Sequence, residues 1–182
     1  MIRILDFLAA FLGLLFLWPI LLVVFIIGIF DTGSPIFVQE RVGRHKKPFK
    51  LIKFRTMSIE TKSVASHLAN NASITTLGNF LRKTKIDELP QLINVVKGDM
   101  SLVGPRPNLF NQEELVRERD AQCVYDVLPG ITGLAQVQNI DMSTPELLAK
   151  TDKEMIDTLT LKDYFKYILM TATGSGSGDA VK

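Results

Sequence analysis

The chain has 182 residues, of which 47% are hydrophobic and 22% charged, and this composition excludes a disordered or fibrous protein. Its formal net charge of +2 hides an uneven distribution: residues 31–100 contain twelve Lys and Arg against six Asp and Glu, whereas residues 101–182 contain eight against twelve. The single cysteine, Cys123, excludes an intramolecular disulfide and gives no support for an oxidising compartment.

The N-terminal segment predicts a membrane helix. Residues 7–30 carry no charged side chain, and as a helix they reach about 36 Å, enough for a bilayer core of about 30 Å. A cleaved signal peptide is disfavoured, because the apolar run is too long, only Arg3 precedes it and no small-residue cleavage site follows. Pro19 lies near the middle and predicts a kink. Two topologies stay open: a kinked spanning helix, and a helix that bends at Pro19 and returns to the same side.

A β-hairpin is expected after this segment. Residues 36–42 and 49–57 are rich in β-branched and aromatic residues, and the stretch between them supplies turn residues. The region is strongly basic, which suits anionic lipid head groups, nucleic acid or a phosphorylated substrate, and charge alone does not choose among them. The basic residues are Arg41, Arg44, Lys46, Lys47, Lys50, Lys53 and Arg55.

Helices are expected in much of the remaining chain, which makes the fold class α+β. Residues 76–84 place apolar side chains on one face, and residues 61–70 are weakly helical. Residues 87–96 predict a helix with Asp87 as its N-cap, Pro90 in its first turn and Gly98 after its end.

Two loops and two further helical regions complete the prediction. The stretches SLVGPRPN and LPGITG read as loops, and residues 113–127 between them read as a charged surface helix containing a half-buried Cys123. A last helical region begins at residues 144–146 and ends in an aromatic cluster suited to a membrane surface. The tail of residues 173–182, with its GSGSGD stretch, is expected to be flexible.

The adjacent carboxylates Asp87 and Glu88 are the first candidates for chemistry. They stand at a predicted helix start just after the basic residues Arg82, Lys83 and Lys85. Neighbouring helical positions point about 100° apart, so one carboxylate could attack or take a proton while the other binds a metal. Helix N-terminal amides also favour an incoming phosphate. The alternative is ordinary helix capping.

Arg106 is the second candidate, because two prolines restrict the backbone around it in a Gly-Pro-Arg-Pro loop and suit a guanidinium held for a phosphate. An ordinary surface arginine is the alternative.

His45 and His67 lack metal-ligand spacing and are predicted to be surface residues. The sequence has no Walker A, GxGxxG, GxSxG or HExxH motif, which removes the commonest nucleotide-binding and hydrolase functions.

Taken together, these features resemble the monotopic phosphoglycosyl transferases, bacterial enzymes that start glycoconjugates on a polyprenol phosphate. The resemblance covers nearly the whole chain in order: the apolar helix with its proline, PIFVQERVG, KFRTM, LGNFLRKTKIDELPQLINVVKGDMSLVGPRP and PGITGLAQV. It implies transfer of a sugar 1-phosphate from a UDP-sugar to undecaprenyl phosphate with release of UMP.

The resemblance also implies roles for matching residues. Asp87 would be the nucleophile that attacks the β-phosphate and carries the phosphosugar, and Glu88 would hold Mg²⁺ or assist proton transfer. Arg55, Arg82 and Arg106 match basic positions near the phosphates, and Gln136 matches a polar pocket position. This agrees with the chemistry, since phosphoryl transfer between anions depends on charge neutralisation.

A membrane topology and a compartment follow from the same resemblance. Residues 1–30 would form a re-entrant helix broken at Pro19, and residues 31–182 a catalytic domain with interfacial helices on the cytoplasmic face of the bacterial inner membrane. Two departures concern the details: Trp18 stands where the family usually has Ser, and residues 138–141 replace a Gly- and Arg-containing stretch. The sugar is therefore left open, although short family members include users of modified N-acetylamino sugars.

A membrane-tethered adaptor or nucleic-acid binder is the competing hypothesis. It would use the basic residues of 41–55 as a binding patch and be indifferent to Asp87. The sequence counts against it, because the patch lacks a base-stacking motif and Phe49 and Phe54 are expected to face a core. No nucleic-acid partner is therefore expected.

Overall fold

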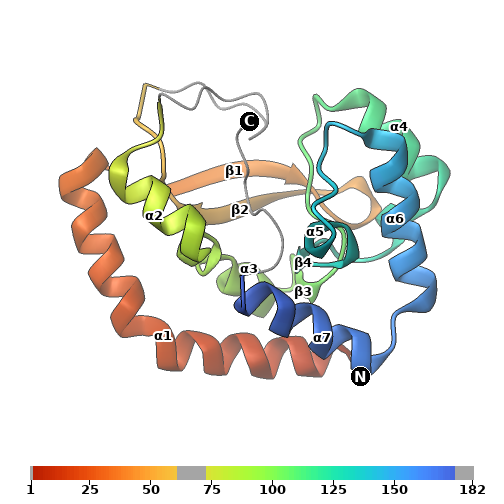
Figure 1. Cartoon of the computed structure of the whole chain (residues 1–182), viewed down its shortest axis with the longest axis horizontal. Helices are drawn as coiled ribbons and strands as arrows, with labels where there is room; N and C mark the ends of the chain where they lie inside the picture. Colours follow the sequence, from red (N-terminus) through yellow and green to blue (C-terminus); the bar gives the residue numbers. More distant parts are fainter. Residues whose placement is uncertain (1, 61–72, 175–182) are drawn as a thin grey trace. The chain divides into compact units, whose positions relative to one another are not determined.

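The computed structural model describes residues 2–60 and 73–174, and these form two compact units. The N-terminal unit comprises residues 1–39 and 50–97, and the C-terminal unit comprises residues 40–49 and 98–177, in each case over their described parts. The predicted helix at 61–70 and the tail from 175 onward lie outside the described residues. The order of elements is shown in Figure 1.

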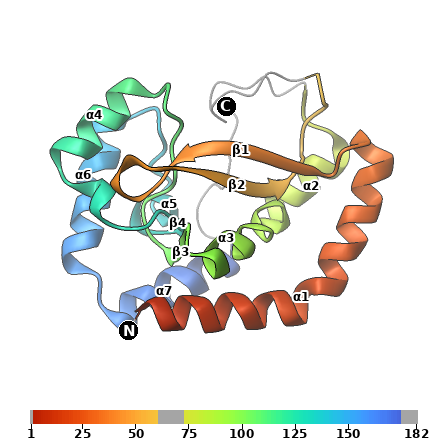
Figure 2. The same ribbon diagram turned by 180° about the vertical axis from the view of Figure 1, so that it is seen from behind.

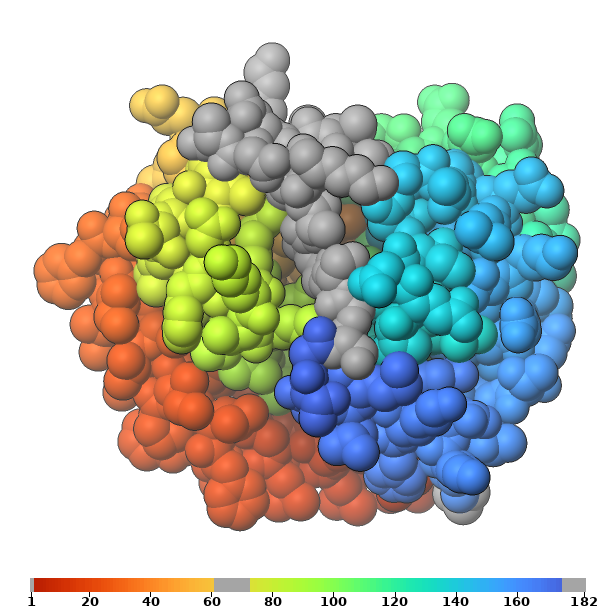
Figure 3. Space-filling view, in the orientation of Figure 1, coloured from red at the N-terminus to blue at the C-terminus, as the bar shows by residue number. Residues whose placement is uncertain are grey.

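The first helix, α1 (Ile2–Thr32), confirms the long apolar helix expected at the N-terminus. Within the described residues it alone is long and apolar enough to cross a membrane, by length and composition. It runs through Pro19 as one element, and its ribbon is bent in both views (Figures 1 and 2). Its buried residues are Asp6, Ala10, Val24 and Gly28. Most of its large apolar side chains are exposed, and its red and orange atoms lie open on the face drawn in Figure 3.

The predicted hairpin is confirmed. Strands β1 (Ile36–Val42) and β2 (Pro48–Phe54) form a two-stranded sheet, joined by the short 3-10 turn η1 (Arg44–Lys46). The second strand ends three residues earlier than predicted. Each strand has one part in either unit, because the unit boundaries fall at residues 39–40 and 49–50.

The core of the N-terminal unit joins α1, the sheet and α2 (Thr76–Thr84), a helix found at its predicted bounds. Val24, Phe54 and Leu81 form its buried centre, with partly buried apolar side chains around them. Thr75 caps α2 by accepting a hydrogen bond from the Gly78 amide at 2.9 Å. The Thr75 hydroxyl also donates to Asp31 at the end of α1, over 2.7 Å.

The predicted helix over residues 87–96 is wrong at its start. The chain forms the 3-10 turn η4 (Ile86–Glu88) and then the helix α3 (Gln91–Lys97). Asp87 is therefore not the N-cap of α3. The predicted stop is correct, because Gly98 follows with a φ of 97°, which glycine adopts without strain.

The C-terminal unit contains two strands where loops were predicted. Strand β3 (Ser101–Val103) pairs in parallel with β4 (Gly130–Thr132), with Ser101 opposite Gly130 and Val103 opposite Thr132. Three residues are too few to show an alternating pattern, so these strands gave no sequence signal.

Helical segments make up most of the rest of this unit. They are α4 (Glu113–Ala121), the 3-10 turn η5 (Val124–Asp126), α5 (Leu134–Val137), α6 (Pro145–Thr158) and α7 (Leu161–Ala172). Helix α7 contacts both strands. The predicted helix over 113–127 is thus interrupted: Cys123 has a φ of 55° and is exposed rather than half-buried. The last helical region is two helices, α6 and α7, and Leu115 of α4, Ala135 of α5 and Leu148 of α6 form a buried cluster.

Candidate active site

The Asp87–Glu88 pair is the centre of the candidate site in the N-terminal unit. Both side chains are buried, with 2% and 6% of their surface exposed. Buried carboxylates are costly unless the protein compensates their charge, and two in sequence are unusual in a structural turn. Their burial therefore favours a functional role over ordinary helix capping.

A left-handed residue creates the turn that carries this pair. Lys85 has a φ of 56°, and its amide donates to the carbonyls of Leu81 and Arg82, which ends α2. The Glu88 amide then donates to the Lys85 carbonyl at 3.2 Å, closing the 3-10 turn. The two carboxylates consequently lie between the end of α2 and the start of α3.

Asn94 fixes α3 against the sheet. Its side chain is fully buried, its Oδ1 accepts from the Ile52 amide at 3.1 Å, and its Nδ2 donates to the Lys50 carbonyl at 2.8 Å. The amide therefore matches both groups of a β2 main-chain edge, so that the helix following Asp87 is held in one register on the strand.

Two of the three predicted arginines lie in the same unit as the carboxylates. Arg82 is on α2, which contacts η4, and its Nε donates to the Thr56 hydroxyl at 2.9 Å. Arg55 follows β2, donates from Nε to the Ser34 carbonyl at 2.8 Å, and lies over the Phe37 ring at 5.3 Å. Both guanidinium groups are thus oriented by neighbouring strand ends rather than left to solvent.

Arg106 and Gln136 belong to the C-terminal unit, where the Gly-Pro-Arg-Pro loop (residues 104–107) follows β3 directly. The Gly104 amide donates to the Thr132 carbonyl at 2.8 Å, and the Gly130 amide donates to the Pro105 carbonyl at 2.8 Å. A Cβ on Gly130 would lie 2.0 Å from the Gly104 nitrogen, so only glycine permits this approach. The loop that carries Arg106 is therefore fixed through its backbone.

Gln136 lies beside this loop. Its Nε2 donates to the Gly104 carbonyl at 3.3 Å, and its Oε1 is buried with no hydrogen-bond partner among the residues described. The resemblance placed Gln136 in a polar pocket, and the contact that the structure gives it is with the loop backbone.

Sequence reasoning missed Arg119 and Asp152. Arg119 is buried on α4, a helix predicted to be a charged surface helix, and pairs with the fully buried Asp152 of α6 over 2.6 Å. Burial raises the pKa of the Asp152 carboxyl, and the adjacent Arg119 charge opposes part of that rise. Helical spacing in the sequence could have indicated the burial of Arg119, because Arg119 lies four residues after Leu115 and so shares its buried face.

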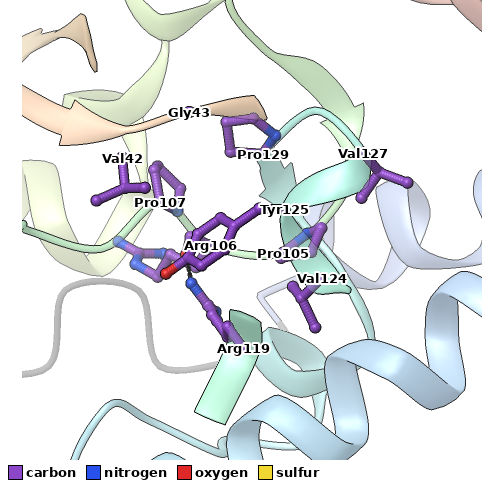
Figure 4. A pocket seen from close by; sticks show the side chains of 10 residues that line it. All are labelled: Val42, Gly43, Pro105, Arg106, Pro107, Arg119, Val124, Tyr125, Val127 and Pro129. Carbon is purple, nitrogen blue, oxygen red and sulfur yellow. Dashed lines mark hydrogen bonds between the residues drawn. The ribbon is translucent and has the colours of Figure 1, made fainter. Parts of the chain in front are cut away.

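A small recess lies beside Arg106, lined by apolar and polar side chains of the C-terminal unit (Figure 4). Its volume is ≈ 10 Å³, room for about one water molecule and far less than a small-molecule site needs. The recess is therefore not itself a sugar-nucleotide pocket. Its lining residues are Val42, Gly43, Pro105, Arg106, Pro107, Arg119, Val124, Tyr125, Val127 and Pro129.

Asp87 and Glu88 are of the donor type that magnesium uses when it binds together with a phosphate. Across residues 2–60 and 73–174, no group of three or more His, Cys, Asp or Glu side chains is gathered as a metal cage. Magnesium at phosphate-transfer sites needs only one or two carboxylates plus substrate oxygens and water, and Asp87 and Glu88 are two such carboxylates.

The two histidines were predicted to be surface residues. His45 is exposed and lies 3.7 Å from Asp126, and His67 is outside the described residues.

Comparison with known proteins places these features in a family context. Residues 1–176 match the profile of the family described as bacterial sugar transferase. The sugar transferase EpsL of Bacillus subtilis, described as uncharacterized, is 42% identical over 140 residues, which cover 76% of this chain and 69% of the relative.

Two further relatives have names that state a reaction. A UDP-glucose:undecaprenyl-phosphate glucose-1-phosphate transferase of Caulobacter vibrioides is 37% identical over 179 residues, 93% of this chain and 67% of the relative. The undecaprenyl-phosphate galactose phosphotransferase of Salmonella typhimurium is 44% identical over 125 residues, 59% of this chain and 26% of the relative. The matches thus span between 26% and 69% of these three relatives.

Proposed function

Because the chain belongs to the bacterial sugar transferase family, we propose that it transfers a sugar 1-phosphate from a UDP-sugar to undecaprenyl phosphate. The observation that carries this proposal for the site is the buried Asp87–Glu88 pair, held in a short turn that contacts the helix of Arg82. Such a pair would supply the nucleophile that a two-step transfer of phosphate requires, with a second carboxylate beside it. The product would begin a bacterial glycoconjugate.

The first step forms a bond from an Asp87 carboxylate oxygen to the β-phosphorus of the UDP-sugar. The bond from that phosphorus to the oxygen of UMP breaks, and UMP leaves with the electron pair. In the second step an oxygen of undecaprenyl phosphate attacks the same phosphorus. The Asp87 carboxylate is then released, and the sugar is left on an undecaprenyl diphosphate.

Charge neutralisation is the chief requirement of both steps, since an anion approaches an anion each time. Following the family resemblance, we assign Arg55, Arg82 and Arg106 to the phosphates; contacts within their own units orient the first two and fix the backbone of the third. Glu88 would hold Mg²⁺, which supplies further positive charge to the phosphate oxygens when bound, or would assist proton transfer.

The membrane accounts for the meeting of the two substrates. We propose that α1 enters the inner membrane from the cytoplasmic face and returns to that face, with its bend near Pro19 inside the bilayer. The exposed apolar side chains of α1 support membrane contact. A water-soluble UDP-sugar and a lipid-embedded acceptor would then both reach a catalytic domain formed by residues 31–182.

The test is UMP release from the purified protein with Mg²⁺, using UDP-glucose, UDP-galactose and UDP-N-acetylgalactosamine in turn. With donor and no acceptor, we expect a burst of about one UMP per enzyme and an intact mass raised by one phosphosugar. Asp87→Asn should abolish both, with a loss of several orders of magnitude in turnover.

The matched control is Asp157→Asn, which removes an exposed carboxylate of α6 paired with Lys153. This variant should keep the burst and the adduct. A near-normal rate for Asp87→Asn, or a burst without any covalent adduct, would contradict the proposed mechanism.

A further inference from the structure

The loop that carries Arg106 is held by side chains from three elements. Gln136 of α5 donates to the Gly104 carbonyl at 3.3 Å, Arg119 of α4 donates to the Arg106 carbonyl at 2.7 Å, and Arg41 of β1 donates to the Pro107 carbonyl at 3.1 Å. Three of the four carbonyls of the loop are thus fixed from outside it, in addition to its backbone hydrogen bonds.

Arg119 makes the most extensive of these contacts. One terminal nitrogen donates both to the Arg106 carbonyl and to Asn108 Oδ1, the latter at 2.9 Å. Its Nε and other terminal nitrogen donate to the same Asp152 oxygen, at 3.0 and 2.6 Å. Tyr125 donates to Asn108 Oδ1 as well, at 3.1 Å. Figure 4 shows the Arg119 side chain directed at the backbone of Arg106.

A stabilising role does not account well for this pair. Arg119 and Asp152 are 1% and 0% exposed, and removing such charges from water offsets much of their attraction. Moreover, the second Asp152 oxygen is buried with no hydrogen-bond partner among the described residues, an arrangement that costs free energy. Both hydrogen bonds from Arg119 to Asp152 thus go to the single oxygen Oδ2 from one edge of the guanidinium, and the opposite edge donates to the loop.

The consequence for Arg106 is a fixed backbone. The prolines on either side of it restrict rotation about their own N–Cα bonds, and the Arg119 hydrogen bond fixes the peptide plane that joins Arg106 to Pro107. The position from which the Arg106 side chain leaves the loop is therefore determined by Arg119, and the orientation of Arg119 is determined by Asp152.

We propose that Arg119, oriented by Asp152, is a positioning residue that holds Arg106 for the phosphates of the sugar nucleotide. This rests on the proposed function, in which Arg106 binds those phosphates. Arg119 touches no substrate in this scheme and acts only through the loop.

A double-mutant cycle tests the coupling, with UMP release as the assay and the fastest of UDP-glucose, UDP-galactose and UDP-N-acetylgalactosamine as donor. Lysine at 119 keeps the charge beside Asp152 but cannot reach both sides at once. Arg119→Lys should lower kcat/KM by about tenfold to a hundredfold. In an Arg106→Lys background, Arg119→Lys should lower kcat/KM by less than about threefold, because the guanidinium that Arg119 positions is already absent. Arg117→Lys, exposed on the same helix, is the control and should change neither value.

Arg119→Lys can fail to fold, and a second variant covers that case. The pair Arg119→Met with Asp152→Leu removes both charges together, which is commonly neutral or stabilising for a buried ion pair. We expect its melting temperature to stay at or above that of the wild type while kcat/KM falls as in Arg119→Lys. Amide hydrogen exchange at Gly104 and Gly130 should become faster in this variant, since the loop loses its hydrogen bond from Arg119.

The outcomes separate the two proposals. If no UDP-sugar gives UMP, the proposed function fails, and exchange at Gly104 and Gly130 still decides whether Arg119 orders the loop. If Arg106→Lys lowers kcat/KM, but Arg119→Lys lowers kcat/KM by the same factor in that background as in the wild type, the positioning role is wrong. Full activity, or unchanged exchange, in the double variant likewise overturns it.

Discussion

The lack of a side chain at Gly78 determines where Arg82 lies in the N-terminal unit. A Cβ on Gly78 would lie 2.0 Å from the Thr56 carbonyl oxygen, so the absence of a side chain lets α2 approach the segment after β2. That approach brings Arg82 within 2.9 Å of the Thr56 hydroxyl. A glycine one turn before a candidate phosphate-binding arginine therefore has a positional function.

Gly78→Ala should consequently lower both stability and activity. The added methyl group has only backbone to displace, so the free energy of unfolding should fall by about 1–3 kcal/mol, and UMP release should slow because Arg82 shifts. Denaturant unfolding and the burst assay measure the two effects. Gly13→Ala is the control, since its Cβ would meet only the end of the Leu92 side chain at 3.1 Å. Equal stability of the two variants would contradict this account.

Asn94→Ala should destabilise the protein by about 1–3 kcal/mol, because it leaves the Ile52 amide and the Lys50 carbonyl without their side-chain partner. The loss should appear in thermal or denaturant unfolding. Asn79→Ala, at an exposed position of α2, should cost nothing measurable. If both substitutions had the same small effect, Asn94 would not be what holds α3 on the sheet.

The sequence identified the candidate residues by chemical type but not their surroundings. Adjacent carboxylates and an arginine between prolines are visible in any linear reading. The burial of Asp87 was not visible, because capping and catalysis require the same residues at a helix start. Arg119 was misread for a related reason: a charged side chain is assigned to the surface unless its partner is known, and Asp152 lies 33 residues away in the chain.

At the scale of elements, the length of the sequence pattern distinguished the elements that were predicted correctly from those that were not. The apolar run of α1, the β-branched and aromatic residues of β1 and β2, and the amphipathic α2 were predicted because each pattern extends over at least seven residues. Strands β3 and β4 have three residues each and exist through their mutual pairing. Turn η4 depends on the left-handed conformation of Lys85. The sequence does not indicate this conformation, because glycine is the residue that usually adopts it at a helix end.

Helix α7 provides a prediction about pH. Thr160 and Asp163 form a capping box at its start, and these hydrogen bonds lower the pKa of Asp163 below its ordinary value. The ionised carboxylate therefore contributes stability above the ordinary Asp pKa, and this contribution is lost as the pH falls through the lowered value. Asp163→Asn should be less stable than the wild type at pH 6, and the difference should narrow toward pH 3.

Thermal melts at both pH values check this, with Thr160→Ala as the companion variant because it removes the hydroxyl side of the same box. The two substitutions together should cost little more than either alone, since they remove one shared interaction. A difference between Asp163→Asn and the wild type that is the same at pH 6 and pH 3 would count against the ionised cap.

At the scale of the whole molecule, the membrane topology of α1 is the main prediction. Cys123 is the single cysteine of the chain, so Cys123→Ser gives a background without thiols. In that background, Ile2→Cys should resist a membrane-impermeant maleimide on intact cells and react after lysis, because re-entry keeps both helix ends on the cytoplasmic face. Ser58→Cys, at an exposed position after β2, should behave identically. Labelling of Ile2→Cys on intact cells would instead establish a spanning helix.

The way the β1–β2 hairpin is divided has a consequence for dissecting the protein. Its tip, residues 40–49, is grouped with a body whose other residues begin only at position 98, and Arg41 and Val42 bond there to Pro107 and Asn108. No single cut of the gene yields either body whole, because each is assembled from separated stretches of chain. Nearly sixty more residues must be synthesised before that tip meets its partners, so a chain truncated between positions 50 and 98 should leave the tip without Pro107 and Asn108.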